Sequence, residues 1–114
     1  MNLYADTLYI ADVHSVSNMG FPWDRLKDKS LMLSGATGLI GSFLVDVILE
    51  KNISDNLNCT VYALVRNEQR AKERFDKFSG DCHLKFISYD VRSPLKASHV
   101  GNVDYILHLA SNTH

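Results

Sequence analysis

Runs of apolar residues along the chain follow two different spacings, and the two spacings alternate. Short runs that are mainly apolar, β-branched or aromatic predict four strands, at Leu31–Leu33, 60–65, 84–89 and 105–109. The first run has no polar alternation, which is typical of a strand covered on both faces in a parallel sheet.

Longer segments between these strands place apolar residues one, three and four positions apart, as on one side of a helix. The first such segment predicts a helix that ends near Lys51 and Asn52, with a buried stripe of Leu39, Ile40, Phe43, Leu44, Val47 and Ile48. Residues 68–78 predict a charged helix with a narrow apolar stripe of Ala71, Phe75 and Phe78, and residues 91–102 predict a short, irregular crossover. Alternating strands and helices indicate an α/β fold with a parallel sheet of order 3-2-1-4 flanked by helices.

The first 29 residues carry a weaker pattern. Tyr4, Leu8, Ala11 and Ser15 share one helical face and predict a short helix over about residues 3–14. Phe21 and Trp23 offer large apolar surfaces just ahead of the first core strand, and we expect them to pack against the domain. The chain therefore divides into an N-terminal arm, residues 1–29, and an α/β portion, residues 30–114.

Three glycines lie between the first strand and the first long helix, in the sequence Gly35-Ala-Thr-Gly-Leu-Ile-Gly41. Gly35 lets the chain turn sharply, Gly38 removes a Cβ where a ligand would approach, and Gly41 lets the helix pack closely. The helix N-terminus then presents free N–H groups and a partial positive charge to an anion. A strand, a glycine turn and a helix in this order favour a nucleotide-binding turn over a purely structural one.

Together with two later motifs, this turn resembles a known family. Asp90-Val91 and His108-Leu-Ala-Ser111 fall where the extended short-chain dehydrogenase/reductases, the NAD-dependent epimerase/dehydratase family, have their third- and fourth-strand motifs. The nearest branches are the nucleotide-sugar dehydratases and UDP-glucuronate decarboxylases. The resemblance covers about residues 29–114 and implies a Rossmann-like fold, a bound dinucleotide, a nucleotide-sugar substrate and a homodimeric parent enzyme.

The resemblance also implies which residues hold the cofactor. Asp90 would accept a hydrogen bond from the adenine amino group, although an aspartate there could equally cap the following turn. Ser111 could bond a phosphate or ribose, or satisfy its own backbone. His108, flanked by leucines, is expected to be a buried, hydrogen-bonded residue and not a catalyst. The cofactor-binding set is Gly35, Thr37, Gly38, Leu39, Ile40, Gly41, Arg66, Asp90, Val91, Leu109, Ala110 and Ser111.

Arg66 follows the second strand, where NAD-selective relatives carry an acidic residue that accepts hydrogen bonds from the adenosine ribose. An arginine cannot accept those bonds, but it can pair with a 2′-phosphate. The sequence therefore favours NADP over NAD, with an exposed or adenine-stacking arginine as the alternative.

No catalytic residue is expected in this chain. The family uses a tyrosine with a lysine four residues later, and none of the five tyrosines has a lysine at that spacing. We therefore expect the chain to be the N-terminal, cofactor-binding part of a longer enzyme. That enzyme is an NAD(P)-dependent nucleotide-sugar epimerase, dehydratase or decarboxylase, or an NADPH-dependent carbonyl or thioester reductase, as Leu64-Val-Arg-Asn67 suggests. A non-catalytic, redox-sensing nucleotide-binding module is a third reading.

Composition limits the partners and the cellular location that the sequence predicts. Hydrophobic residues make up 46% and charged residues 22%, with a net charge of −1 and no basic cluster, so a nucleic-acid partner is not expected. No apolar run approaches the length of a membrane span and no signal peptide is evident, which predicts a cytoplasmic location. Cys59 and Cys82 are expected to be reduced thiols, and the histidines have no ligand spacing that predicts a metal site.

Overall fold

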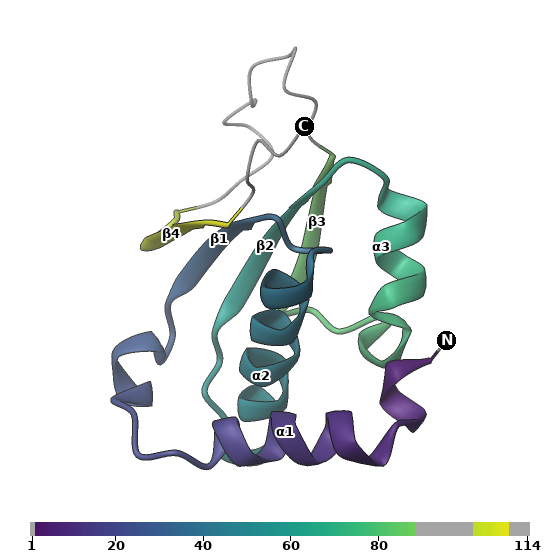
Figure 1. The fold of residues 1–114 in the computed structure, drawn as a ribbon. Coiled ribbons are helices and arrows are strands. Elements are labelled where there is room, and N and C mark those ends of the chain that lie inside the picture. The colour runs from purple at the N-terminus through teal and green to yellow at the C-terminus, as the bar shows by residue number, and fades with distance from the viewer. Residues whose placement is uncertain (1, 89–101, 110–114) are drawn as a thin grey trace.

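The computed structural model describes residues 2–88 and 102–109 of the 114-residue chain. Four parallel strands form one sheet in the order β3-β2-β1-β4, as the sequence predicts. The strands are β1 (Ser30–Ser34), β2 (Thr60–Val65), β3 (Leu84–Ser88) and β4 (Tyr105–His108). Figure 1 shows the helices gathered on one side of this sheet, with α1 lying across α2.

The strand bounds agree with the sequence prediction to within one or two residues. Pairing joins Leu33 to Ala63 between the two central strands, and Ser34 to His108 between β1 and β4. Tyr89 and nearly all of the predicted 91–102 crossover lie outside the described residues. The parallel sheet with flanking helices confirms a partial Rossmann-like α/β fold.

Helix α2 (Leu39–Asp55) is buried on two sides, because it lies between the sheet and α1. Val45 and Leu49 pack with the sheet residues in the main core, and Val47 and Ile48 are buried as expected. The prediction that Leu39 and Ile40 are buried is wrong.

Those two side chains are 89% and 66% exposed. They occupy the first turn of α2, directly after the loop that leaves the carboxyl end of β1, and neither belongs to the core clusters of the described residues. Helix α2 also runs three residues beyond the predicted end at Asn52, to a left-handed C-cap at Asn56.

The N-terminal segment forms a short 3₁₀ turn η1 (Leu3–Ala5), helix α1 (Thr7–Ser17) and a 3₁₀ turn η2 (Trp23–Leu26). One continuous helix over 3–14 does not form, because Asp6 is an extended N-cap residue whose carboxylate accepts from the N–H groups of Leu8 and Tyr9. Trp23 packs against the main core as expected, whereas Phe21 is largely exposed.

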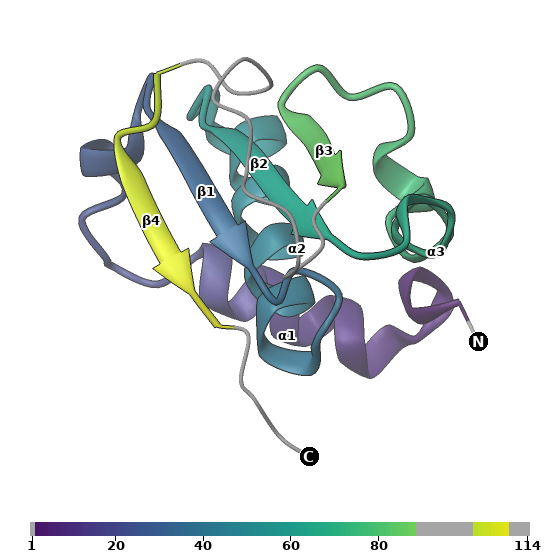
Figure 2. The same ribbon diagram turned by 90° about the horizontal axis from the view of Figure 1, so that it is seen from above.

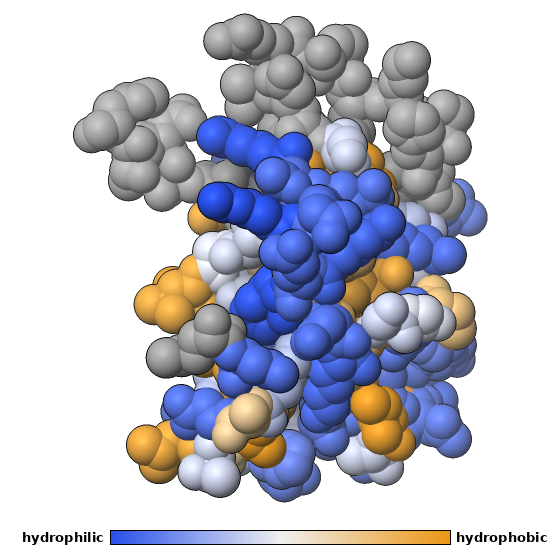
Figure 3. Space-filling model, turned by 90° about the vertical axis from the view of Figure 1, so that its right-hand side faces the viewer, coloured by the Kyte–Doolittle hydropathy of each residue, from blue (hydrophilic) through white to orange (hydrophobic). Residues whose placement is uncertain are grey.

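The charged segment after β2 folds as helix α3 (Glu68–Arg74) followed by a 3₁₀ turn η3 (Asp76–Phe78). Its predicted apolar stripe of Ala71, Phe75 and Phe78 is buried against the sheet. The face of the molecule that carries α3 is mainly hydrophilic (Figure 3), as expected for the solvated side of this helix.

A buried carboxylate on α2 joins this helix to three other helical segments. Asp46 of α2 is 1% exposed and forms an ion pair with Arg74 of α3, with 2.8 Å between Oδ2 and Nη2. Tyr4 donates to Asp46 Oδ1 at 2.6 Å, and the hydroxyl of Tyr9 also donates to this carboxylate. Arg74 in turn donates to both tyrosine oxygens, at 3.0 and 2.7 Å. The Asp46 cluster, defined by these four residues, attaches the N-terminal segment to the α/β portion.

The surroundings of Tyr4, Tyr9 and Arg74 keep these three side chains protonated. Burial, together with the hydrogen bond to Asp46, raises the pKa of Tyr9 to about 12 and raises the pKa of Tyr4 further. Burial opposes the charge on Arg74, but its hydrogen bond and ion pair with Asp46 outweigh that effect and raise its pKa. At neutral pH both tyrosines therefore keep their hydroxyl protons and donate hydrogen bonds to the Asp46 carboxylate.

We expect Asp46→Asn to lower the free energy of unfolding by about 3–5 kcal/mol, since it leaves the Arg74 guanidinium partly buried without its counter-charge. Urea denaturation followed by the fluorescence of Trp23, the single tryptophan, measures the change. The control is Lys77→Gln, which removes the more exposed Lys77–Glu50 pair and should cost less than about 1 kcal/mol. Equal effects of the two substitutions would contradict a dominant role for the buried pair.

Candidate functional site

The glycine turn lies at the carboxyl edge of the sheet, between the end of β1 and the start of α2. Figure 2 shows the arrowheads of the parallel strands pointing toward this edge. The register pairs Leu33 with Ala63, so Gly35, the first residue after β1, lies level with Val65, the last residue of β2. This is the edge at which open α/β sheets bind their ligands.

Gly35 begins the turn with a φ of 69°, a left-handed conformation that favours glycine. Its carbonyl oxygen accepts from the N–H of Gly38 at 3.0 Å, which closes the turn. Gly38 itself has an ordinary φ of −71°, so its backbone conformation does not require glycine. A Cβ at position 38 would lie 3.3 Å from the Gly35 carbonyl oxygen, so a side chain there is tight but not blocked by the protein.

Gly41 is required by the close approach of α2 to the turn. A Cβ on this residue would lie 2.0 Å from the Gly35 carbonyl oxygen and 2.8 Å from its carbonyl carbon. Both obstacles are backbone atoms, which cannot move aside as a flexible side chain could. The third glycine thus brings the first turn of α2 directly against the strand exit, as the sequence predicts for close helix packing.

The start of α2 has the geometry of an anion site. Gly38 is the N-cap residue, and Ser42 makes the first intrahelical hydrogen bond to the Gly38 carbonyl, at 2.9 Å. The N–H groups of Leu39, Ile40 and Gly41 precede that bond and lie at the positive end of the helix dipole. Residues 37–40 are exposed whereas Gly41 is buried, so a phosphate could reach the first turn from the side of Leu39 and Ile40.

Arg66 follows β2 at the same edge and is exposed. The next residue, Asn67, caps α3 by accepting from the N–H of Arg70 at 3.0 Å. This cap fixes the point at which the chain leaves the sheet, and it places Arg66 between the strand end and the helix. A positively charged side chain therefore follows the end of β2, the strand next to β1 and its glycine turn.

The structure describes some of the other predicted cofactor residues but not all of them. Thr37, Leu39 and Ile40 lie on the exposed turn, and Leu109 follows β4 with its N–H donating to Ser34 Oγ at 3.0 Å. Asp90, Val91, Ala110 and Ser111 lie outside the described residues, so their cofactor roles stay predictions.

His108 is hydrogen-bonded but not buried, which corrects the sequence prediction. Its Nδ1 lies 2.8 Å from Ser34 Oγ, and its side chain is exposed because β4 is an edge strand among the described strands. Ser34 therefore links the carboxyl ends of β1 and β4 beside the glycine turn. Sequence reasoning missed this serine, although its place immediately before Gly35 was a usable signal.

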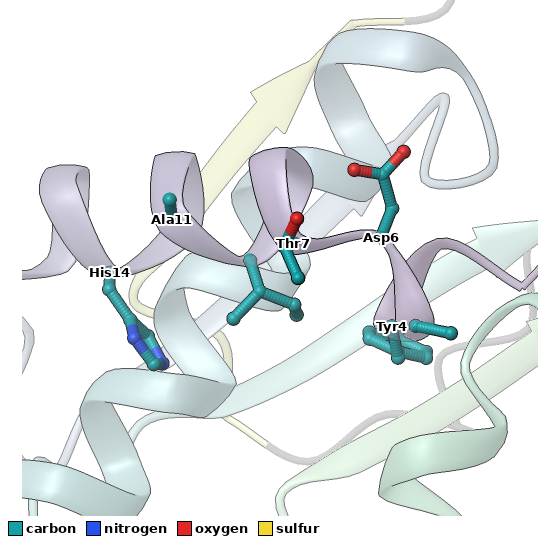
Figure 4. Close-up of a pocket in the computed structure, with 7 residues that line it drawn as sticks. Tyr4, Asp6, Thr7, Ala11 and His14 are labelled. Atoms are coloured by element: carbon teal, nitrogen blue, oxygen red, sulfur yellow. The ribbon is translucent and has the colours of Figure 1, made fainter.

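A separate shallow pocket runs along η1 and α1 between Tyr4 and His14 (Figure 4). Three of its polar side chains already have structural partners: Tyr4 donates to Asp46, Asp6 caps α1, and His14 Nε2 lies 3.5 Å from Glu50 Oε1. Figure 4 also shows the Asp6 carboxylate on the opposite side of α1 from Tyr4 and His14. These groups do not converge on a ligand, and the pocket is not included in the candidate site.

The arrangement around the glycine turn is the first half of a dinucleotide-binding α/β domain. It consists of a strand, a tight glycine turn and a helix start without a side-chain cap, beside parallel neighbouring strands. Comparison with protein-family models agrees: residues 33–114 match an NAD-binding family described as male sterility protein. The match covers more than half of the chain, which therefore belongs to this family. A comparison with curated proteins finds no match.

Family membership establishes a nicotinamide dinucleotide-binding domain of oxidoreductase type. The nucleotide-sugar branches that the sequence resembles stay a prediction, as does the choice between NAD and NADP. Among the helices in the described part of the chain, none combines the length and apolar character needed to cross a membrane.

We expect Gly41→Ala to destabilise the protein by about 1–3 kcal/mol, because the new Cβ overlaps the Gly35 carbonyl. The sign of this change in unfolding free energy is informative, because without the overlap alanine stabilises a helix interior by about 1 kcal/mol relative to glycine. Gly38→Ala is the matched control: its Cβ would lie 3.3 Å from the same oxygen, so the cost should stay below about 1 kcal/mol. Denaturant midpoints of both variants test this, and equal stability would contradict the close approach.

Proposed function

We propose that the chain is the dinucleotide-binding part of an NADPH-dependent reductase that acts on a carbonyl or thioester. The observation that carries the proposal is the exposed Arg66 at the carboxyl end of β2, on the strand next to the glycine turn. Membership of an NAD-binding family supports the dinucleotide, and the arginine supports its phosphorylated form.

In this proposal the dinucleotide pyrophosphate lies against the start of α2. The exposed N–H groups of the first turn would donate to the phosphate oxygens, with Gly38 leaving room for the ligand. The adenosine half would then extend across the end of β2 toward Arg66. A guanidinium donates hydrogen bonds and carries a fixed positive charge, so it complements a 2′-phosphate better than two ribose hydroxyls.

Arg66 also favours a net reduction over a reaction that returns the hydride to its substrate. NADPH is the usual donor for net reductions, in which the oxidised cofactor leaves after every turnover. A nucleotide-sugar epimerase or dehydratase instead takes a hydride from the sugar and returns it within one cycle. The Gly-x-x-Gly-x-x-Gly turn supports that second candidate, because it resembles the cofactor turn of the epimerase/dehydratase family.

The two candidates differ in cofactor stoichiometry. A reductase consumes one NADPH for each hydride that it transfers, so one is oxidised per aldehyde reduced and one or two per thioester, and the absorbance of the reduced nicotinamide falls in proportion to product. An epimerase converts its nucleotide sugar without a net change in that absorbance. The assay is made on the full-length protein, with aldehyde, thioester and nucleotide-sugar substrates in parallel. Conversion of a nucleotide sugar without net oxidation of NADPH would replace the proposal with the second candidate.

The first binding prediction concerns the glycine turn. Gly38→Val should abolish binding of both NADPH and NADH, because its branched side chain would fill the space where a phosphate approaches the backbone. The fold should persist, since the φ of −71° is allowed for any residue. Calorimetric titration measures binding, and circular dichroism checks the fold. A folded variant with unchanged affinity would place the phosphate elsewhere.

A second binding prediction separates the two cofactors. Arg66→Asp should lower the affinity ratio of NADPH to NADH by more than about tenfold, since it replaces a charge-assisted hydrogen bond of about 1.5–3 kcal/mol with repulsion. Lys72→Asp, an equal charge change at an exposed position on α3, should leave the ratio unchanged. A constant ratio in the Arg66 variant would mean that this side chain does not reach the ribose.

A further inference from the structure

Three loops meet at the amino edge of the sheet, opposite the glycine turn. They precede β1, β2 and β3, and backbone hydrogen bonds fix them. The N–H of Asp28 donates to the Leu57 carbonyl at 3.1 Å, which joins the first two loops, and the N–H of Val61 in β2 donates to the His83 carbonyl at 2.7 Å, which holds the third loop against that strand. Asp28 and Asn58 both adopt left-handed conformations, with φ of 61° and 56°. The loops are therefore held in defined positions relative to one another.

Side-chain hydrogen bonds across these loops fix the orientation of His83. The amide nitrogen of Asn58 donates to Asp28 Oδ1 at 2.8 Å, which leaves the amide oxygen of Asn58 facing His83 Nε2 at 2.7 Å. An amide oxygen can only accept, so Nε2 must carry the proton. In the neutral imidazole the free electron pair is then on Nδ1.

This electron pair faces two other electron-rich groups. His83 Nδ1 lies 3.3 Å from Asp81 Oδ1 and 3.8 Å from Cys82 Sγ, and the three donor atoms all lie within 4.8 Å of one another. The Asp81 carboxylate is held in place because its Oδ1 also accepts from the His83 backbone N–H at 2.8 Å. A carboxylate oxygen and an imidazole lone pair repel each other unless a cation lies between them.

The spacing of the donor atoms is suitable for a tetrahedral ion. Zinc bound at ordinary lengths to nitrogen, oxygen and sulfur separates its nitrogen and oxygen ligands by about 3.4 Å and its nitrogen and sulfur ligands by about 3.6 Å. The observed separations of 3.3 and 3.8 Å are close to these values. Cys82 is exposed, so an ion from solvent can reach the sulfur.

We propose that Asp81, Cys82 and His83 bind a zinc ion, with water completing the coordination. Binding releases the Cys82 thiol proton to solvent and forms a thiolate–zinc bond. A thiolate and an imidazole favour zinc over magnesium or calcium, which prefer oxygen ligands. The contact from Nε2 to Asn58 supplies the second hydrogen bond that commonly orients a metal-binding histidine.

A proton on His83 Nδ1 is the competing cation, since it would give an ion pair with Asp81. The two possibilities differ in their need for Cys82, because the proton does not require the thiol. The zinc site lies at the edge opposite the glycine turn, so its occupation should not change dinucleotide binding. The inference is therefore independent of the proposed reductase function.

Metal binding is measured on metal-free protein without a histidine tag, by competition with a chromophoric zinc chelator. Cobalt substitution is the second readout, since a Cys82 thiolate bound to cobalt gives a charge-transfer absorption in the near ultraviolet. We expect one zinc per chain, bound with at least tenfold lower affinity in both Cys82→Ser and His83→Gln. The charge-transfer band should disappear in Cys82→Ser.

Two further variants test whether zinc binds at His83 and not at another histidine. His14→Gln alters an exposed histidine on α1 and should leave zinc affinity unchanged. Asn58→Gly keeps the left-handed backbone possible but removes the partner of Nε2, so it should weaken zinc about 10- to 100-fold. Circular dichroism confirms that each variant is folded. Absence of zinc binding, or equal affinity in wild type and Cys82→Ser, would overturn the proposal.

Discussion

Burial of the Asp46 carboxylate is the constraint on which the arrangement of the helices depends. A carboxylate that is 1% exposed must find charge and hydrogen-bond partners inside the protein, because its desolvation otherwise costs several kcal/mol. Arg74 supplies the charge, and Tyr4 and Tyr9 supply two further hydrogen bonds. Since these partners come from α3, η1 and α1, one buried charge specifies how three segments surround α2.

This arrangement encloses α2 from two directions. The sheet covers one of its sides and α1 the other, so the helix is anchored along its middle while its N-terminus remains open to solvent. Anchoring matters for the glycine turn because the first turn of α2 lies against the Gly35 backbone, where Gly41 leaves no space for a side chain. The N-terminal segment can therefore support the candidate site without contributing a residue to it.

The two edges of the sheet differ in chemistry. At the carboxyl edge, exposed backbone N–H groups and Arg66 create a positive environment suited to an anionic ligand. At the amino edge, Asp81, Cys82 and His83 bring together donor atoms suited to a cation. Parallel pairing produces this separation, because every strand begins at one edge and ends at the other. Any ligand at one edge is thus kept away from the other by the length of the strands.

The sequence by itself determined the four strands, the glycine turn and the apolar stripe of α3, since these follow from local periodicity and backbone chemistry. The strand order followed from the rule that alternating strands and helices pair through right-handed crossovers. Only the tertiary structure decided that α2 is buried on two sides, that Leu39 and Ile40 are exposed, and that His108 lies at an open edge. Burial depends on which segments meet, and Asp46, Arg74 and Tyr4 meet across 28 and 42 residues of sequence. No local pattern contains information about such distant contacts, whereas the turn between β1 and α2 is encoded within seven consecutive residues.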